Sequence, residues 1–266
     1  MYETTYHRAG SVAEAASKMA SAEDGKFLGG GQTLLPTMKQ RLAAPSDLID
    51  LGSIGDMTGI SESGGAISIG GATTHAEVAS SDVVKAKIPG LAKLASGIGD
   101  PAVRHKGTLG GSIANNDPAA DYPSALVALG ATVTTSKRSL AAEDFFTGMF
   151  ETALADDEIV TSVSFPISEK SAYAKYPNPA SRYAMAGVFV AKGADGSVKV
   201  AVTGAGQDGV FRVSDMEAAL SSNWSADAVA GISVPADGLL ADIHGSSEYR
   251  ANLVTVMAKR AVAAAG

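Results

Sequence analysis

GGGQTLLP at residues 29–36 is the most informative stretch of this 266-residue chain, and TLGGSIAN at residues 108–115, about eighty residues later, is a second glycine-rich stretch. Glycine tolerates positive φ angles and lets backbone N–H groups approach an anion closely. Two such stretches in one domain can therefore hold the two ends of a pyrophosphate. Either stretch alone is weak evidence, because an isolated run of glycines is more often a tight turn.

The residues around the first stretch predict a βαβ-like unit. A strand is expected over residues 26–28, a helix over 33–42 and a second strand over 47–51. An earlier helix over 11–20 has Ser11 in the N-cap position. A glycine-rich loop between a strand and a helix is a favourable phosphate site, because N–H groups at a helix start lack intrahelical acceptors.

The remaining pattern predicts an α+β fold. Up to residue 167, strands are expected over 66–71, 131–135 and 158–165, and helices over 74–79, 90–96 and 123–129. Beyond it, three antiparallel strands are expected over 171–176, 186–191 and 198–203, followed by helices near 213–220, 226–230 and 247–264. This change of texture predicts two parts, residues 1–167 and 168–266. The second glycine stretch lies in a region of poor periodicity, residues 97–122, which a ligand could help to order.

Composition excludes several classes of protein. The net charge is −7 and no basic stripe is visible, which argues against a nucleic-acid partner. The absence of cysteine excludes disulfides, cysteine-bound zinc and iron–sulfur clusters on this chain. No signal peptide and no apolar run near ~20 residues is present, so we expect a soluble cytoplasmic protein without an integral membrane segment.

Reactive groups are sparse in the sequence. The four histidines are far apart and predict no metal site, and His75 is interpreted as structural. The acidic run Asp156-Asp157-Glu158 is interpreted as a solvated turn. No nucleophile or Walker motif occurs, so no catalytic residue is predicted; the pattern suits a protein whose bound cofactor does the chemistry.

The sequence contains one complete Gly-x-Gly-x-x-Gly match, at residues 204–209. We interpret it as a glycine-rich turn at the end of the preceding strand rather than as a dinucleotide site. A Rossmann unit needs a helix that opens within the motif and a second parallel strand ending in an acidic residue. Neither pattern follows here. A near-match at residues 97–102 follows a predicted helix and contains a proline, so it is no better.

Several motifs together resemble the FAD-binding medium subunit of molybdenum hydroxylases, the xanthine oxidase family, in the style of aerobic carbon monoxide dehydrogenase. They are GGGQTLLP (29–36), RHKGTLGGSIAN (104–115), DPAADYP (117–123), YAKY (173–176) and SEYR (247–250), in the same order and spacing. The resemblance covers essentially the whole chain.

The resemblance implies an FAD-binding domain of the vanillyl-alcohol oxidase and p-cresol methylhydroxylase type over residues 1–167, with subdomains of about 1–53 and 54–167. A C-terminal α+β domain with a three-stranded antiparallel sheet would span 168–266. It further implies a small iron–sulfur subunit and a large molybdopterin subunit as partners, arranged as a dimer of heterotrimers. Electrons would leave through FAD to an external acceptor, and the complex could be peripheral to the inner membrane.

The resemblance also assigns the cofactor-binding residues. The two glycine stretches would hold the pyrophosphate through backbone N–H groups, and Asn115 and Asp121 would contact ribityl or sugar hydroxyls. Lys175 would offset the negative charge of the phosphate or the flavin, and Tyr183 would pack on the isoalloxazine. The residues assigned are Gly29, Gly30, Gly31, Gln32, Thr33, Leu34, Leu35, Thr108, Leu109, Gly110, Gly111, Ser112, Asn115, Asp121, Lys175 and Tyr183.

The four residues assigned through their side chains could instead have ordinary structural roles. Asn115 and Asp121 suit turn or helix capping, and Lys175 and Tyr183 suit a strand surface and a core. Two further functions stay open as well: a stand-alone FAD-dependent oxidase or dehydrogenase, and an assembly subunit that binds no cofactor.

Overall fold

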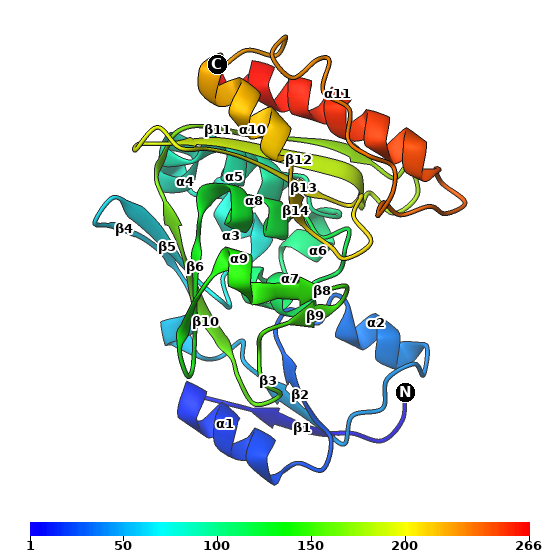
Figure 1. Cartoon of the computed structure of the whole chain (residues 1–266). Helices are drawn as coiled ribbons and strands as arrows, with labels where there is room; N and C mark the ends of the chain where they lie inside the picture. Colours follow the sequence, from blue (N-terminus) through cyan, green and yellow to red (C-terminus); the bar gives the residue numbers. More distant parts are fainter.

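The computed structural model describes all 266 residues as three sheets and one short hairpin, with helices between and outside them (Figure 1). The first sheet is parallel, in the order β1-β3-β2. Its unit comprises β1 (Thr5–Arg8), α1 (Val12–Ser21), β2 (Gly25–Leu28), α2 (Leu34–Lys39) and β3 (Asp47–Asp50). The predicted βαβ connection is present, because β2 pairs in parallel with β3 and α2 lies between them in the chain.

Local signals explain where the first helices begin and end. The Ser11 hydroxyl accepts a hydrogen bond from the Glu14 N–H, as its N-cap position predicts. Helix α2 is shorter than expected, because Arg41 takes a left-handed conformation with φ of 63° just beyond Gln40. Below the sheet, α1 contributes Ala15 to a small core with Ile49 and Met57.

The second sheet is antiparallel, in the order β4-β5-β10-β6-β7, and carries helices on one face (Figure 1). Its strands are β4 (Ile60–Ser63), β5 (Ala66–Gly70), β6 (Thr132–Thr135), β7 (Ser139–Ala141) and β10 (Val160–Pro166). The helices are α3 (His75–Ser80), α4 (Asp82–Lys87), α5 (Pro89–Ser96), α6 (Pro101–Arg104), α7 (Leu109–Asn115), α8 (Tyr122–Leu129) and α9 (Ala142–Phe145), with a 3₁₀ turn η1 (Gly55–Met57). The hairpin β8 (Phe146–Gly148) and β9 (Glu151–Thr152) follows α9.

The region of poor periodicity, residues 97–122, contains two short helices, α6 and α7. Each begins at a side-chain cap: the Asp100 carboxylate accepts from the Val103 N–H, and the Thr108 hydroxyl accepts from the Gly111 N–H. Such short helices leave too few turns for a periodic apolar pattern, which explains why the sequence did not predict them.

The third sheet has four antiparallel strands rather than the three expected. They are β11 (Ser168–Pro177), β12 (Ala184–Gly193), β13 (Val198–Thr203) and the two-residue β14 (Phe211–Arg212), followed by α10 (Ser214–Ser222) and α11 (Ser247–Ala265). Residues 226–230 form turns, so the helix expected there is wrong.

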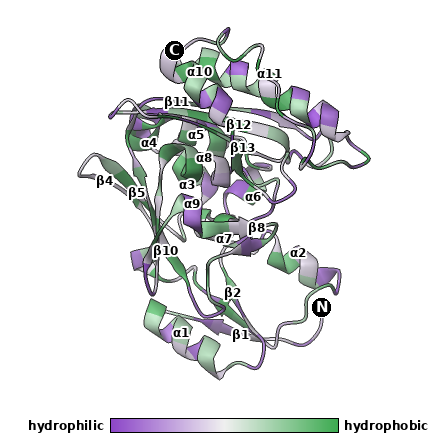
Figure 2. Ribbon diagram, in the orientation of Figure 1, coloured by the Kyte–Doolittle hydropathy of each residue, from purple (hydrophilic) through white to green (hydrophobic).

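The long strands of the third sheet are buried on both faces. Along β12, Val188 and Val190 pack towards α10 and α11, whereas Phe189 packs into the core formed by α5 and α8. Every residue of α8 is buried, and Figure 2 shows this helix as largely hydrophobic. A strand covered on both sides needs apolar residues at consecutive positions, which is the pattern from Ala184 to Ala191.

The predicted domain boundary lies in the short step between β10 and β11. Strand β10 ends at Pro166 and β11 begins at Ser168. Because Tyr173 and Phe189 belong to the same buried cluster as α5 and α8, the third sheet shares a core with the part before it. Whether residues 168–266 form a separate domain stays a prediction.

Gly90 lets α5 lie directly on β11. A Cβ atom at this position would lie 2.9 Å from the backbone N and Cα of Ala172. We predict that Gly90→Ala lowers the free energy of unfolding by about 1–3 kcal/mol, because the helix must move off the sheet. Urea unfolding of the full chain measures this change.

The matched control is Gly97→Ala at the other end of the same helix. The nearest atom to a Cβ there is 3.4 Å away. The control should change stability by less than about 0.5 kcal/mol. Equal effects of the two substitutions would contradict the close approach at Gly90.

Candidate functional site

A cavity of about 820 Å³ lies where the first sheet, the second glycine stretch and the β11–β12 loop meet. Its volume is in the range of small-molecule and cofactor sites. Thirteen of the sixteen assigned residues line it: Gly29, Gly30, Gly31, Gln32, Thr33, Leu34, Thr108, Gly110, Gly111, Ser112, Asn115, Asp121 and Tyr183. Leu35, Leu109 and Lys175 are not part of the lining.

The first glycine stretch is in direct backbone contact with Lys106 and Gly107, which immediately precede the second stretch. A Cβ at Gly30 would lie 1.9 Å from the carbonyl oxygen of Lys106 and 2.6 Å from the Cα of Gly107. A Cβ at Gly110 would lie 2.7 Å from the carbonyl oxygen of Gly71. Only glycine permits these approaches, so part of the glycine pattern serves the packing of the loops against each other.

The first stretch presents a run of unpaired backbone donors. The N–H groups of six consecutive residues, Gly29–Leu34, have no hydrogen-bond acceptor within the chain; the first helical bond runs from the Leu35 N–H to the Gly31 carbonyl at 3.2 Å. Gly31 has a φ of 69°, which turns the chain between β2 and α2. Consecutive N–H groups in such a turn form a concave site for an anion.

The second stretch differs, because its donors are already used. The Leu109 N–H donates to Thr73, the Gly110 N–H to Gly71 and the Ser112 N–H to Thr108, all to carbonyl oxygens. The Gly111 N–H donates to the Thr108 hydroxyl at 3.1 Å. This stretch therefore offers the cavity a smooth glycine surface and polar side chains rather than a row of N–H groups.

Asp121 and Lys175 form a buried pair at one wall of the cavity. The Lys175 ammonium lies 3.0 Å from the Asp121 carboxylate and donates to the Gly97 carbonyl oxygen at 2.8 Å. The Tyr173 hydroxyl donates to the same carboxylate. Burial raises the pKa of Asp121, and the positive charge of Lys175 opposes that rise.

Lys175 was assigned to the cofactor site, but it contacts Asp121 and does not itself line the cavity. Its side chain is 10% exposed and lies behind Asp121, which itself lines the cavity. Its ammonium holds both the Asp121 carboxylate and the Gly97 carbonyl oxygen, next to lining residues 98–100.

Two surface loops supply aromatic side chains to the cavity. Tyr183 comes from the β11–β12 loop and is 48% exposed, and Phe150 comes from the tip of the β8–β9 hairpin. Burial raises the pKa of Tyr183, with a further contribution from the negative charge of Asp117. Phe150, and Arg182 just before Tyr183, were not predicted from the sequence, because no local motif marks either position.

His75 lines the cavity as a neutral, buried ring. It is 4% exposed and its Nδ1 atom has no hydrogen-bond partner. Burial lowers the pKa of His75 to about 4, with a further contribution from the positive charge of Arg104. Its ring lies 5.4 Å from the ring of Tyr122.

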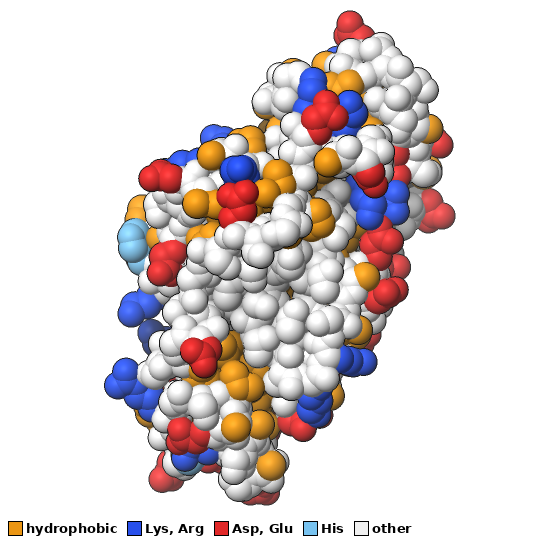
Figure 3. All heavy atoms as spheres, turned by 90° about the vertical axis from the view of Figure 1, so that its left-hand side faces the viewer, with side chains coloured by type: hydrophobic (Ala, Val, Ile, Leu, Met, Phe, Trp, Pro, Cys, Tyr) orange, Lys and Arg blue, Asp and Glu red, His pale blue; other side chains and the backbone are white.

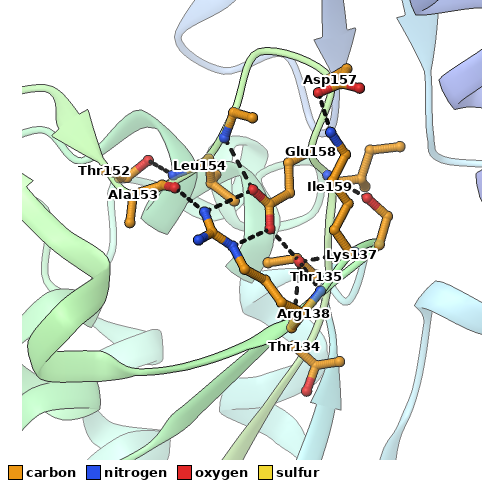
Figure 4. Close-up of polar contacts among 12 residues, drawn as sticks. Thr134, Thr135, Lys137, Arg138, Thr152, Ala153, Leu154, Asp157, Glu158 and Ile159 are labelled. Carbon is orange, nitrogen blue, oxygen red and sulfur yellow. Dashed lines mark hydrogen bonds and ion pairs between the residues drawn. The ribbon is translucent and has the colours of Figure 1, made fainter.

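Glu158 has a buried carboxylate that pairs with the half-exposed Arg138, which corrects its interpretation as part of a solvated turn; Asp156 and Asp157 are exposed in a turn, as predicted. Figure 4 shows the Arg138 guanidinium on both carboxylate oxygens, with distances of 3.0 and 3.1 Å. The Thr135 hydroxyl donates to the same carboxylate at 2.6 Å, and so does the Ala155 N–H at 3.1 Å. Mainly because Arg138 donates to it, the pKa of Glu158 falls to about 2.

The ionisable side chains of the cavity are mostly acidic. Asp100, Asp117, Asp121 and Glu158 line it, against Lys26 and Arg182. An anionic group bound here must therefore rely on backbone N–H groups more than on cationic side chains, which points to the Gly29–Leu34 run.

The Gly-x-Gly-x-x-Gly match at residues 204–209 lies outside the cavity lining. The strand before the Gly-x-Gly-x-x-Gly match leads into the antiparallel β14, so the match is not a Rossmann turn. No group of histidine, aspartate and glutamate side chains is arranged to hold a metal ion. None of the helices combines the length and apolar character needed to span a membrane.

Comparison with known proteins gives the family. The family model described as the FAD binding domain in molybdopterin dehydrogenase matches residues 2–168. The chain belongs to the FAD-binding medium subunits of molybdenum hydroxylases. The nicotine 6-hydroxylase medium subunit of Paenarthrobacter nicotinovorans is 35% identical over 98% of this chain and 96% of the relative. The carbon monoxide dehydrogenase medium chain of Hydrogenophaga pseudoflava is 32% identical over 98% and 96%.

Solved structures agree with this family. A crystal structure of the Cu,Mo-CO dehydrogenase has a TM-score of 0.88 at 31% identity and covers all of this chain and 98% of the matched chain. Quinoline 2-oxidoreductase from Pseudomonas putida 86 has a TM-score of 0.88 at 28% identity, with coverage of 99% and 96%. The family, the α+β fold and FAD as the cofactor are thereby confirmed, and the chain is a flavoprotein subunit of an oxidoreductase. The residue assignments within the cavity stay predictions.

We predict that Glu158→Gln lowers the free energy of unfolding by about 1–3 kcal/mol at pH 7, because Arg138 loses its ionic acceptor. Arg138 is about half exposed, so solvent screens part of the effect. The pKa of Glu158 is about 2 in the folded chain, against 4.5 ordinarily. The ionised carboxylate therefore stabilises the fold above about pH 5, and this contribution is lost as the pH falls through about 2.

Urea unfolding at pH 7 and pH 3 measures the difference between the two proteins. The gap should narrow at pH 3. A gap that is equal or larger at pH 3 would contradict the low pKa of Glu158. Asp157→Asn, which removes the exposed neighbour of Glu158, is the control and should change stability little.

Proposed function

We propose that this chain is the subunit through which electrons leave a molybdenum hydroxylase complex. A small iron–sulfur subunit would deliver the electrons, a large molybdopterin subunit would oxidise the substrate, and an external acceptor would collect the electrons from this chain. A bound FAD supplies the redox chemistry, since a flavin accepts electrons singly and releases them in pairs. The complex is proposed to be a dimer of heterotrimers.

One observation carries the cofactor placement: the six unpaired N–H groups of Gly29–Leu34 beside the cavity. A pyrophosphate carries several negative oxygens and requires several donors. Because the ionisable side chains of the lining are mostly acidic, the backbone is the main source of such donors in this cavity.

The other assigned residues would position the organic parts of the cofactor. Gly111 and Ser112 would form a smooth wall, and Asn115 and Asp121 would accept hydrogen bonds from sugar or ribityl hydroxyls. Lys175 and Tyr173 would hold Asp121 in place, since both donate to its carboxylate. Tyr183 would pack on the isoalloxazine as a large, half-exposed aromatic side chain.

The substrate is proposed to be chosen on another subunit. The relatives are named for nicotine and carbon monoxide, and a third, from Sulfolobus acidocaldarius, is named a glyceraldehyde dehydrogenase medium chain. Their identities to this chain all fall between 32% and 35%. The resemblance of this subunit therefore does not follow the substrate.

Substitutions at the neighbouring Gly110 and Gly111 should distinguish an effect on cofactor binding from an effect on folding. We predict that Gly111→Val weakens FAD binding by at least about tenfold while the chain still folds, because a Cβ there meets only the Thr108 hydroxyl, at 2.9 Å. FAD titration by fluorescence and thermal unfolding measure the two effects. Gly110→Ala is the control: it should lower the melting temperature, since its Cβ meets the backbone of Gly71. Unchanged FAD content in Gly111→Val would contradict the proposal that Gly111 forms part of the wall against which FAD binds.

Purification from the native source tests the complex. We expect FAD, molybdenum and iron to copurify with this chain, at a mass consistent with two copies of each of three subunits. A flavin-only monomer that turns over a small alcohol or hydroxy acid would favour the stand-alone oxidase. A colourless protein that takes up no added FAD would favour an assembly subunit instead.

A further inference from the structure

Phe150 is displayed at the cavity in an unfavourable backbone conformation. It lies at the tip of the β8–β9 hairpin with a φ of 57°, a left-handed conformation that disfavours a bulky side chain by about 1–2 kcal/mol. Its side chain is 55% exposed and lines the cavity. Burial in a core does not account for this residue, and glycine would fit the turn better.

A buried asparagine fixes the tip in place. Asn116 is 1% exposed, and its amide nitrogen donates to the carbonyl oxygens of Gly148 and Glu151, both at 2.8 Å. The Phe150 N–H in turn donates to the Asn116 carbonyl oxygen at 3.0 Å. The backbone of the hairpin tip is thus held by three hydrogen bonds to Asn116, more than thirty residues earlier in the chain.

The same asparagine links the tip to the second glycine stretch. Asn116 is the C-cap of α7, the helix whose N-cap is Thr108, and its N–H donates to the Ser112 carbonyl oxygen. The hairpin tip and the glycine wall are therefore connected through Asn116. The exposed ring of Phe150 and the lining residues of α7, including Ser112 and Asn115, face the same cavity.

The neighbouring Met149 offers a direct comparison. It is 42% exposed on the same hairpin, yet it does not line the cavity. Of the two exposed apolar side chains at this tip, the strained one faces the cavity. Strain that the surrounding structure holds in place is a recognised mark of a functional position.

We propose that the ring of Phe150 packs against a planar ring of the bound FAD and so helps to hold the cofactor in its cavity. The inference rests on the proposed placement of FAD. A flat apolar side chain matches an aromatic ring system and has nothing to offer a pyrophosphate. The adenine and the isoalloxazine are the two rings that this contact can serve.

The test is the substitution Phe150→Gly in the full chain, with Met149→Gly as the matched control. Glycine relieves the left-handed strain at position 150, so the melting temperature of the FAD-free protein should stay the same or rise. The dissociation constant for FAD should nevertheless increase about tenfold. Phe150→Tyr, which keeps the ring, should bind FAD as the wild type does.

Two half-ligands distinguish the rings. If ADP binds the Phe150→Gly variant more weakly while FMN is unaffected, the contact is with the adenine; the reverse result places it on the isoalloxazine. Either result supports the proposal.

Three results would overturn it. The first is an FAD dissociation constant for Phe150→Gly within twofold of the wild type, and the second is an equal loss in Met149→Gly. The third is a fall in melting temperature larger than that of Met149→Gly, which would make Phe150 a structural residue. A wild-type chain that binds no FAD would refute the proposed cofactor placement itself, which separates that failure from this one.

Discussion

The close approach of two backbone segments is the constraint on which the rest of this structure depends. Gly30 lies against Lys106 and Gly107 with no room for a Cβ atom, so the first sheet and the helices of the second sheet meet at that point. A single methyl group there would separate the two walls of the cavity. Gly71 and Gly110 repeat this contact on the second wall, where the β-sheet and α7 approach each other. The cavity exists because glycine backbones define its edges.

The two glycine stretches look alike in sequence but have different physical roles. The first leaves its N–H groups unpaired, whereas the second uses them to start a helix and to join neighbouring segments. The lining strengthens this division, because its ionisable side chains include more carboxylates than cations. The medium subunit therefore combines one loop suited to binding with one suited to shape.

Much of the fold followed from local rules. Ser11 and the parallel pair around the first glycine stretch were predictable, because caps and strand–loop–helix patterns act over a few residues. Glu158, Lys175 and Phe150 were not predictable in the same way. Each owes its role to a partner 20 to 54 residues away: Arg138, Asp121 and Asn116, respectively. An acidic run in the sequence suggests a solvated turn, and only the three-dimensional structure shows that Arg138 pairs with Glu158.

The Asp121–Lys175–Tyr173 cluster limits how this chain can be divided. The carboxylate belongs to the segment before α8, whereas both of its donors come from β11. A truncation after residue 167 would remove both donors and open a wall of the cavity to water. The third sheet thus supplies the side chains that hold Asp121 at the wall of the cavity. Recombination between medium subunits would therefore have to exchange position 121 together with positions 173 and 175.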